Sequence, residues 1–264
     1  METAGCAPAV SFRERRGPCD HPMRMAVHSS KLTRSETVAE GTMAFHFERP
    51  AGFDFKAGQN MLLTIVDPPE TDSKGPKRTF TIASAPDDAA LMIATRMRDT
   101  AFKRVLKGAA PGLAVQIDGP NGVMTLHDDA ARPAVFLAGG VGITPFLSMA
   151  RDAARRKLPH RIHLFYSNRR PEDAAFLDEL QALERDNPSY HLVATMAEME
   201  KSARAWSGER GVINRALLEK HVPALNGPVY YLAGPPAMTM AMQSMLEMAG
   251  VAEDDIRSEE FYGY

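Results

Sequence analysis

The apolar pattern of the chain changes near residue 130, and this change constrains the fold more than any other feature of the sequence. After that point, short continuous apolar runs alternate with segments whose apolar residues recur at helical spacing. Strands that alternate with helices predict a parallel sheet covered by helices on both faces. We expect strands at 134–140, 161–167, 190–196 and 228–235, and helices at 144–157, 171–186, 214–222 and 236–250.

The segment before residue 128 consists of short runs rich in β-branched and aromatic residues, which Gly and Pro separate. One helix is expected among them from Thr100 to Lys107, where Thr100 is a favourable N-cap. Many short strands with a single helix predict an antiparallel β-barrel capped by that helix. The strands are expected at 27–36, 43–50, 61–68, 78–84, 91–97 and 114–120.

The length of 264 residues is sufficient for two domains of ordinary size. We predict the antiparallel barrel over 25–127, a linker over 128–133 and the α/β domain with its parallel sheet over 134–264. Residues 1–24 are rich in Arg, Pro and Gly and have no apolar periodicity. They are therefore predicted to form a disordered N-terminal extension.

The composition argues against several classes of function. A net charge of -2 gives no indication of a nucleic-acid partner. No apolar run approaches the roughly 20 residues that span a bilayer, and the N-terminal residues lack the apolar core of a secretory signal, so we expect a cytoplasmic protein. The two cysteines, Cys6 and Cys19, fall short of the four thiolates that an iron–sulfur cluster requires, and no metal is expected.

Three segments in the second half are candidates for ligand binding: GGVGITP at 139–145, LAGPP at 232–236 and SEEFYGY at 258–264. The first two follow predicted strands, and open α/β sheets bind ligands at the carboxyl ends of their strands. Glycines allow a phosphate to approach the backbone, and the start of a helix attracts anions. The alternatives are structural turns for the first two segments and a tail docked on the protein's own surface for the third.

The run KRTFTIAS at 77–84 contains an unusual combination of side chains. In a regular strand, Arg78, Phe80 and Ile82 share one face, and Thr79 and Thr81 share the other. A structural strand favours its charged residue on the solvent face. Arg78 therefore either extends past the apolar face to water or faces a ligand that is both aromatic and anionic.

Taken in order, RTFTIAS, TAFKRVL, GPNG, GGVGITP, AGPPAM and EEFYGY resemble the motifs of the ferredoxin–NADP reductase superfamily. The resemblance extends from about Val27 to Tyr264. It implies an FAD-binding barrel followed by a domain that binds a pyridine nucleotide. FMN is the less favoured flavin, because most of the superfamily uses FAD.

The resemblance implies that Arg78 pairs with the flavin pyrophosphate, that Phe80 lies against the flavin ring and ribityl chain, and that the Thr81 hydroxyl faces N5. Phe80 stands where the family more often has Tyr, so one hydrogen bond to the ribityl chain is expected to be lost. The flavin-binding residues implied are Arg78, Thr79, Phe80, Thr81, Ile93, Ala94, Thr95, Ala101, Phe102 and Lys103.

The resemblance also implies a nucleotide site and places Thr81, Ala233 and Glu259 at the reaction centre. Ala233 stands where many relatives have Cys, so a thiol cannot assist there. The residues at this site favour NADH and NADPH equally. The nucleotide-binding or ring-covering residues implied are Gly139, Gly140, Val141, Gly142, Ile143, Thr144, Pro145, Ser167, Asn168, Arg169, Thr195, Gly234, Pro235 and Phe261.

The function implied is that of a flavin-dependent oxidoreductase. It passes a hydride from NAD(P)H to FAD and electrons to a separate carrier, such as a ferredoxin, a flavodoxin or the iron–sulfur protein of an oxygenase. One alternative is direct reduction of a quinone, a free flavin or a ferric chelate. Another is an electron-transfer subunit of a larger complex. The sequence does not identify the electron acceptor or the oligomeric state.

Overall fold

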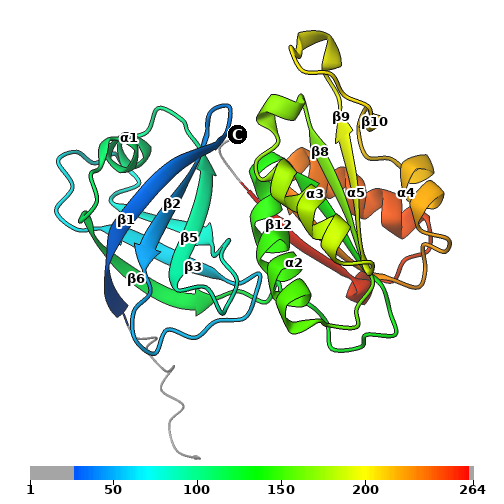
Figure 1. Cartoon of the computed structure of the whole chain (residues 1–264), viewed down its shortest axis with the longest axis horizontal. Coiled ribbons are helices and arrows are strands. Elements are labelled where there is room, and N and C mark those ends of the chain that lie inside the picture. The colour runs from blue at the N-terminus through cyan, green and yellow to red at the C-terminus, as the bar shows by residue number, and fades with distance from the viewer. Residues whose placement is uncertain (1–26, 262–264) are drawn as a thin grey trace, which may run out of the picture.

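The computed structural model describes residues 27–261, and their strands form two separate sheets that lie next to each other (Figure 1). The predicted N-terminal extension, including Cys6 and Cys19, and the C-terminal residues Tyr262, Gly263 and Tyr264 lie outside the described residues. No helix among the described residues is long and apolar enough to cross a membrane.

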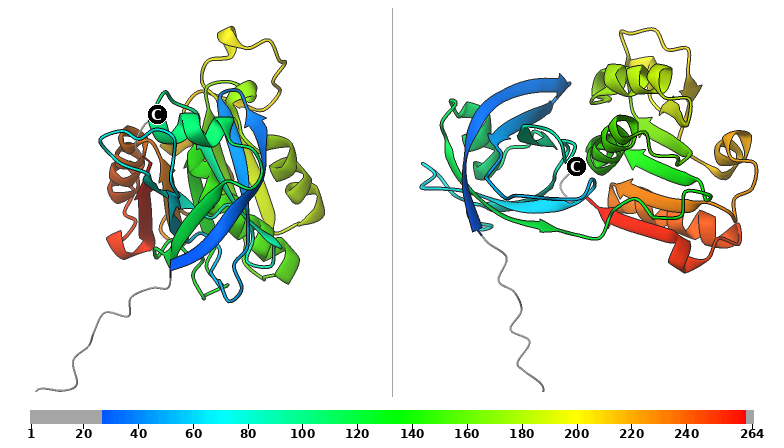
Figure 2. Two further views of the ribbon diagram at one scale, coloured as in Figure 1. Left: turned by 90° about the vertical axis from the view of Figure 1, so that its left-hand side faces the viewer. Right: turned by 60° about the horizontal axis from the view of Figure 1, so that its bottom comes forward.

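The first sheet is antiparallel throughout, with strand order β4-β3-β6-β1-β2-β5. It curls into a half-barrel, and α1 lies at one of its ends (Figures 1 and 2). Below, "half-barrel" means this sheet with α1. Its elements are β1 (Val27–Ala39), β2 (Thr42–Glu48), β3 (Asn60–Ile65), β4 (Lys77–Thr81), β5 (Ala90–Arg96), α1 (Ala101–Gly108) and β6 (Ala114–Asn121).

Alternating apolar residues form the core of the half-barrel. Along β3, Met61, Leu63 and Ile65 are buried and the residues between them are partly exposed, the pattern of a sheet with one face toward the core. The predicted helix forms at Ala101–Gly108, and Thr100 caps it by accepting a hydrogen bond from the Lys103 N–H. The two edge strands, β4 and β5, approach each other. The N–H of Ala83, just after β4, donates to the carbonyl of Met92 in β5 at 2.7 Å.

The second sheet is parallel throughout, with strand order β10-β9-β8-β7-β11-β12. Together with its helices it is called the α/β unit. Its strands are β7 (Ala134–Gly139), β8 (Ile162–Asn168), β9 (Tyr190–Met196), β10 (Glu209–Arg210), β11 (Val229–Gly234) and β12 (Ile256–Glu260). Its helices are α2 (Thr144–Arg156), α3 (Leu177–Asp186), α4 (Arg215–His221) and α5 (Pro236–Met248), with short 3-10 turns η1 (Gly140–Ile143), η2 (Pro171–Asp173), η3 (Met199–Lys201) and η4 (Glu253–Asp255).

Helices cover both faces of the parallel sheet, as the sequence predicts. Phe136 of β7 faces one way and packs in a core with residues of α2 and α3, whereas Val135 and Leu137 face the other way and pack with residues of α4 and α5. The strands are consequently buried on both sides, which explains why their sequences are continuously apolar. The side covered by α2 faces the half-barrel (Figure 2).

Two sequence predictions for the α/β unit were wrong in detail. The helix expected over 171–186 is divided, because Phe176 adopts a left-handed conformation with φ of 60° and α3 begins at the next residue. The C-terminal segment was treated as a tail, but Ile256–Glu260 is a strand that pairs in parallel with β11. Its sequence, IRSEE, has too little apolar content to indicate a strand, since one side of this edge strand faces solvent.

The predicted linker is tied to the α/β unit at both ends. The Tyr231 hydroxyl accepts from the His127 backbone N–H at 2.8 Å and lies 2.9 Å from His127 Nδ1. Arg132 forms an ion pair with Asp255 at 2.7 Å. These contacts fix the direction in which the chain leaves the half-barrel. The domain boundaries placed at 127, 128–133 and 134 remain predictions.

Candidate active site

A cavity of about 850 Å³ lies between the half-barrel and the α/β unit. The half-barrel contributes the loop that precedes β4, residues 78–81 of β4, the end of β5 and the start of α1. The α/β unit contributes Val141 of η1 and the end of β12 with Phe261. We call this the inter-sheet cavity.

Many of the residues predicted to bind the flavin or the nucleotide line the inter-sheet cavity. Those that do are Arg78, Thr79, Phe80, Thr81, Ala94, Thr95, Ala101, Lys103, Val141, Glu259 and Phe261. Two predicted flavin-binding residues, Ile93 and Phe102, instead belong to the core of the half-barrel. Sequence reasoning missed Asp72, Arg96 and Arg98, which also line the cavity.

The arrangement of β4 explains the unusual run that contains Arg78 and Phe80. Both side chains contact Phe102: the guanidinium carbon of Arg78 lies 5.2 Å from the centre of its ring, and the Phe80 ring lies 5.8 Å away. The two residues therefore share a face, as strand alternation predicts. Because β4 is an edge strand of the half-barrel, Thr79 and Thr81 on its other face also border the cavity.

Two buried polar atoms in the cavity have no hydrogen-bond partner among the described residues. They are the Thr81 hydroxyl oxygen and Oε2 of Glu259, whose other oxygen accepts from Asn60 Nδ2 at 3.3 Å. Burial raises the pKa of the Glu259 carboxyl above its usual value. Buried polar groups in native proteins are almost always hydrogen-bonded, so these atoms indicate that a polar ligand belongs in the cavity.

Positive groups gather around the start of α1. Lys103 donates from Nζ to the Arg96 carbonyl at 2.7 Å. Burial lowers its pKa to about 8, with further contributions from Arg98 and Arg78. The first turn of α1 contains no acidic residue, and the helix dipole adds positive potential there. This end of the cavity is suited to an anion such as a diphosphate.

A carboxylate of the protein itself lies at this positive end. Arg78 Nη2 donates to both oxygens of Asp72 at 2.9 and 3.0 Å, and Nη1 donates to the Gly75 carbonyl at 2.8 Å. The contact with Arg78 lowers the pKa of Asp72, and a hydrogen bond from the Ala101 backbone lowers it further. Asp72 thus accepts the hydrogen bonds from Arg78 that the family resemblance assigned to the flavin pyrophosphate.

The predicted glycine turns of the α/β unit meet at the ends of β7, β11 and β12. Register pairs Ala138 with Ala233 and Ala233 with Glu259. The Phe261 N–H donates to the Gly234 carbonyl at 2.9 Å. A Cβ atom on Gly142 would lie 2.3 Å from the Ala233 carbonyl oxygen, so glycine is required for this close approach of η1 to β11.

The other predicted nucleotide-binding residues lie along the same carboxyl edge but do not line the inter-sheet cavity. Ser167 and Asn168 end β8, and Arg169 follows them. Asn168 is buried and its Nδ2 has no partner among the described residues. Thr195 already uses its hydroxyl to donate to the Gly211 carbonyl at 2.7 Å. Gly139 ends β7, Gly140 and Ile143 bound η1, and Thr144 and Pro145 begin α2. Gly234 ends β11, and Pro235 directly precedes α5.

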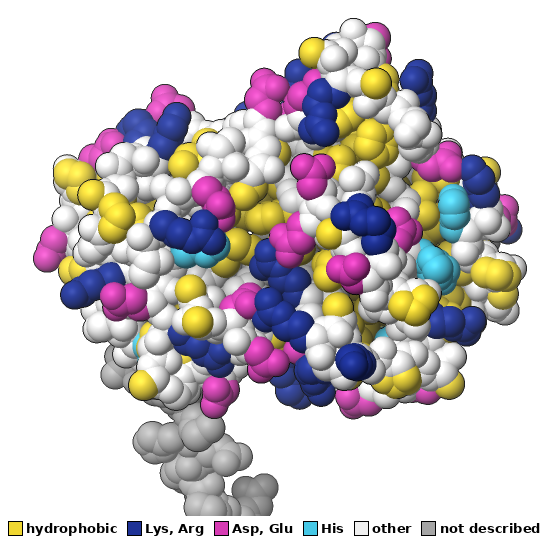
Figure 3. Space-filling model, viewed as in Figure 1, with side chains coloured by type: hydrophobic (Ala, Val, Ile, Leu, Met, Phe, Trp, Pro, Cys, Tyr) yellow, Lys and Arg dark blue, Asp and Glu magenta, His cyan; other side chains and the backbone are white. Residues whose placement is uncertain are grey.

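Basic side chains also gather along the junction between the half-barrel and the α/β unit on the face shown in Figure 3. A second cavity of about 500 Å³ in this junction is lined by both arginines and carboxylates. Arg151 pairs with Glu179 at 2.6 Å, and Arg155 pairs with Asp88 of the half-barrel at 2.6 Å. Because these charges are compensated, the cavity is poorly suited to binding an anion. The ion pair between Arg155 and Asp88 instead helps to hold the two units together.

Comparisons with known proteins agree with this arrangement. Residues 136–244 match the family described as the oxidoreductase NAD-binding domain. The ferredoxin–NADP reductase B of Sorangium cellulosum is 30% identical over 217 residues, which cover 81% of this chain and 84% of that protein. The chain belongs to the ferredoxin–NADP reductase family. It therefore has the two-part organisation that its sequence motifs implied.

Other similarities extend over most of the chain. The reductase component of propane 2-monooxygenase from Rhodococcus jostii is 27% identical over 237 residues, and the match covers 88% of this chain but 63% of that protein. The crystal structure of a ferredoxin–NADP reductase from Neisseria gonorrhoeae with bound FAD and NADP superposes with a TM-score of 0.75 at 22% identity. The match covers 89% of this chain and 98% of that one and supports the fold of this ferredoxin–NADP reductase family member.

Replacing Gly142 with Ala tests the close approach of η1 to β11. The added methyl group meets backbone atoms of Ala233 and Gly234, which cannot rotate away. We expect a loss of about 1–3 kcal/mol in the free energy of unfolding, the usual effect of overpacking, measured by urea denaturation. Gly227→Ala is the control, because its Cβ would enter open space. Equal stability of the two variants would contradict the close approach.

Proposed function

We propose that this chain is an FAD-dependent NAD(P)H oxidoreductase that passes electrons to a separate redox carrier. The observation that carries the proposal is the inter-sheet cavity. It contains unpartnered polar atoms at Thr81 and Glu259, a positive end at Arg78 and Lys103, and a border formed by η1 of the nucleotide-binding motif.

The cavity residues fit FAD in both charge and shape. Arg78, Lys103 and the first N–H groups of α1 would hold the diphosphate, and the apolar face of Phe80 would hold a flat ring. The Thr81 hydroxyl would gain the hydrogen bond that it lacks among the described residues. When bound, the flavin would supply hydride acceptance and the release of electrons singly or in pairs.

The residues of the α/β unit would position the nucleotide and exclude water. Gly142 and Gly234 allow the turn after β7 to pack closely against the end of β11, and Ala233 presents no bulky group beside Glu259. Glu259, whose carboxyl pKa is raised by burial, would offer its unpartnered Oε2 to the ligand. These assignments for Thr81, Ala233 and Glu259, and for the remaining predicted site residues, are proposals.

A separate protein acceptor is favoured by the functions of the relatives. Matches include reductase components or subunits of propane 2-monooxygenase, glycine betaine monooxygenase and a naphthalene 1,2-dioxygenase system. The chain spans 63% of the length of the first of these and 61% of the second. We propose that the one-electron carrier is another protein. A cytoplasmic location is likewise proposed.

Acceptor assays test this function. The protein loaded with FAD is expected to reduce ferricyanide or cytochrome c with NADH or NADPH, and FAD-free protein is expected to be inactive. A reductase component should transfer electrons to a ferredoxin more efficiently than to a quinone. Preference for the quinone would favour the alternative of a small-molecule reductase. No activity with either nucleotide would contradict the proposal.

Lys103 makes FAD binding depend on pH. Its pKa of about 8 means that the free protein loses this positive charge above pH 8, whereas a bound diphosphate favours the charged form. FAD affinity should be constant below pH 8 and fall above it by up to about tenfold per pH unit. Fluorescence titration of the FAD-free protein measures this. Lys103→Arg should give a flat profile, and Lys107→Met on the exposed side of α1 should retain the wild-type profile.

Asp72 competes with the cofactor for Arg78. Asp72→Asn removes the negative charge from the positive end of the cavity, and FAD should then bind roughly tenfold more tightly, the order of one charge-assisted contact. Asp54→Asn is the control, because Asp54 also pairs with an arginine of the half-barrel, Arg49, but neither residue lines the inter-sheet cavity. Weaker FAD binding by Asp72→Asn would show instead that Asp72 holds Arg78 in its binding position.

A further inference from the structure

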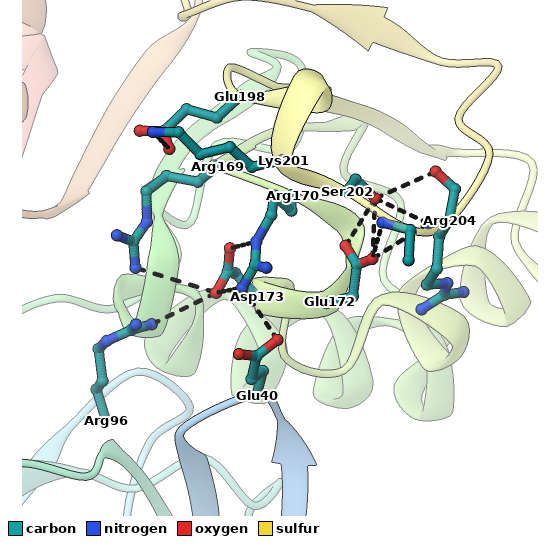
Figure 4. A network of polar contacts seen from close by, with 11 residues as sticks. Glu40, Arg96, Arg169, Arg170, Glu172, Asp173, Glu198, Lys201, Ser202 and Arg204 are labelled. Atoms are coloured by element: carbon teal, nitrogen blue, oxygen red, sulfur yellow. Dashed lines mark hydrogen bonds and ion pairs between the residues drawn. The ribbon is translucent and has the colours of Figure 1, made fainter.

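A hydrogen bond between side chains joins the two units at the inter-sheet cavity. Asn60 is the first residue of β3 in the half-barrel, and its Nδ2 donates to Oε1 of Glu259, near the end of β12 in the α/β unit, at 3.3 Å. Glu259 lines the cavity. The ion pair of Arg170 with Glu40 (Figure 4) also joins the units, but neither of its residues lines the cavity.

The amide group of Asn60 is closely packed. A Cβ atom on Gly122, the residue that follows β6, would lie 2.7 Å from Asn60 Nδ2. Gln59 donates from Nε2 to the Gly122 carbonyl at 3.1 Å and so fixes this approach. Gly122 has a φ of 89°, which favours glycine. The Asn60 amide therefore packs against the end of β6 and donates to Glu259 across the boundary between the units.

Asn60 also lies beside Thr81. In the antiparallel pair of β3 and β4, Asn60 is directly opposite Thr81, and opposed residues point to the same face of a sheet. The next residue of β3, Met61, faces the core of the half-barrel, so Asn60 points away from that core. The two buried cavity atoms without a partner among the described residues, on Thr81 and Glu259, thus belong to the two residues that Asn60 adjoins.

The contact with Asn60 gives the two oxygens of Glu259 different roles. An amide nitrogen only donates hydrogen bonds, so Oε1 is an acceptor whether or not the carboxyl is ionised. A proton on this carboxyl would accordingly be on Oε2, which has no partner among the described residues. Burial raises the pKa of Glu259 and the hydrogen bond from Asn60 lowers it, and no charged side chain of the described residues contributes to this shift.

We propose that Asn60 is the positioning residue of Glu259, because it holds Oε1 and thereby directs Oε2 toward the ligand in the inter-sheet cavity. This inference rests on the proposed function. Asn60 does not line the cavity, so it acts through Glu259 and not by contact with the ligand. An oxygen held in one place can orient the bound nucleotide for reaction. Without the donor, the carboxyl would be free to rotate, and burial would favour its neutral form unopposed.

Titration of Glu259 by carbon-13 NMR tests this role independently of activity. The Glu259 carboxyl signal is the one that Glu259→Gln removes, and it is followed in the full-length protein before and after loading with FAD. Asn60→Leu has a similar size but no donor, and it should raise the midpoint of the titration by roughly one pH unit. Asn60→Asp keeps the shape of the side chain and should raise the midpoint further, because two carboxyl groups then adjoin.

Stopped-flow reduction of the FAD-loaded protein gives the second measurement. Asn60→Leu should lower the limiting rate of flavin reduction by NADH or NADPH about tenfold, the effect of one hydrogen bond to a charged group. The Kd for the nucleotide should change little, because the carboxyl would lose its orientation and not its place in the cavity.

Asn121→Leu is the matched control, because Asn121 of β6 lies opposite Asn60 in the sheet but donates to the Asp118 carbonyl at 3.3 Å. Arg155→Met removes an ion pair between the units away from Glu259. Both variants should keep the wild-type titration and rate. An unchanged titration in Asn60→Leu, or an equal shift in Arg155→Met, would overturn the proposal in favour of general docking of the units. A wild-type flavin that neither nucleotide reduces would instead reject the proposed function, whatever the titration shows.

Discussion

The inter-sheet cavity depends on the carboxyl edge of the parallel sheet lying against the open edge of the half-barrel. Parallel strands end at the same edge, so the turns after β7 and β11 and the end of β12 meet there. The half-barrel contributes β4, an edge strand whose two faces both border the cavity. The ion pairs of Arg155 with Asp88 and of Arg170 with Glu40 join the two units and thereby maintain the cavity.

Lys103 and Arg96 of the inter-sheet cavity have no carboxylate of the described residues at hydrogen-bond distance, whereas Arg78 and Arg104 of the same cavity are paired. Where the units dock, arginines have nearby carboxylates at hydrogen-bond distance, as Arg151 has Glu179. Around the inter-sheet cavity, Lys103 has a carbonyl as its partner, and Arg96 has a carboxylate beyond hydrogen-bond distance. A phosphate-bearing ligand would supply the missing negative charge. Asp72 supplies part of it at Arg78, so cofactor affinity reflects competition between two anions.

Much of the fold was predictable because it follows local patterns. The alternation of β3, the Thr100 cap of α1 and the continuously apolar β7 are each read from adjacent residues. The shared face of Arg78 and Phe80 was predictable for the same reason. The break at Phe176 and strand β12 depend on tertiary packing and were not. Asp72 and Arg96 were missed because their roles depend on residues that lie close to them only in the folded chain. Asp72 pairs with Arg78, and Arg96 lies near Asp173.

The central claim is that the inter-sheet cavity binds a flavin that NAD(P)H reduces. An anaerobic titration of the FAD-loaded protein, followed by visible absorption, tests it most directly. The account predicts that the flavin band disappears on addition of one equivalent of NADH or NADPH, and that Thr81→Val, which removes the hydroxyl that faces the cavity, slows this loss. Protein that retains no FAD, or a flavin band that neither nucleotide bleaches, would contradict it.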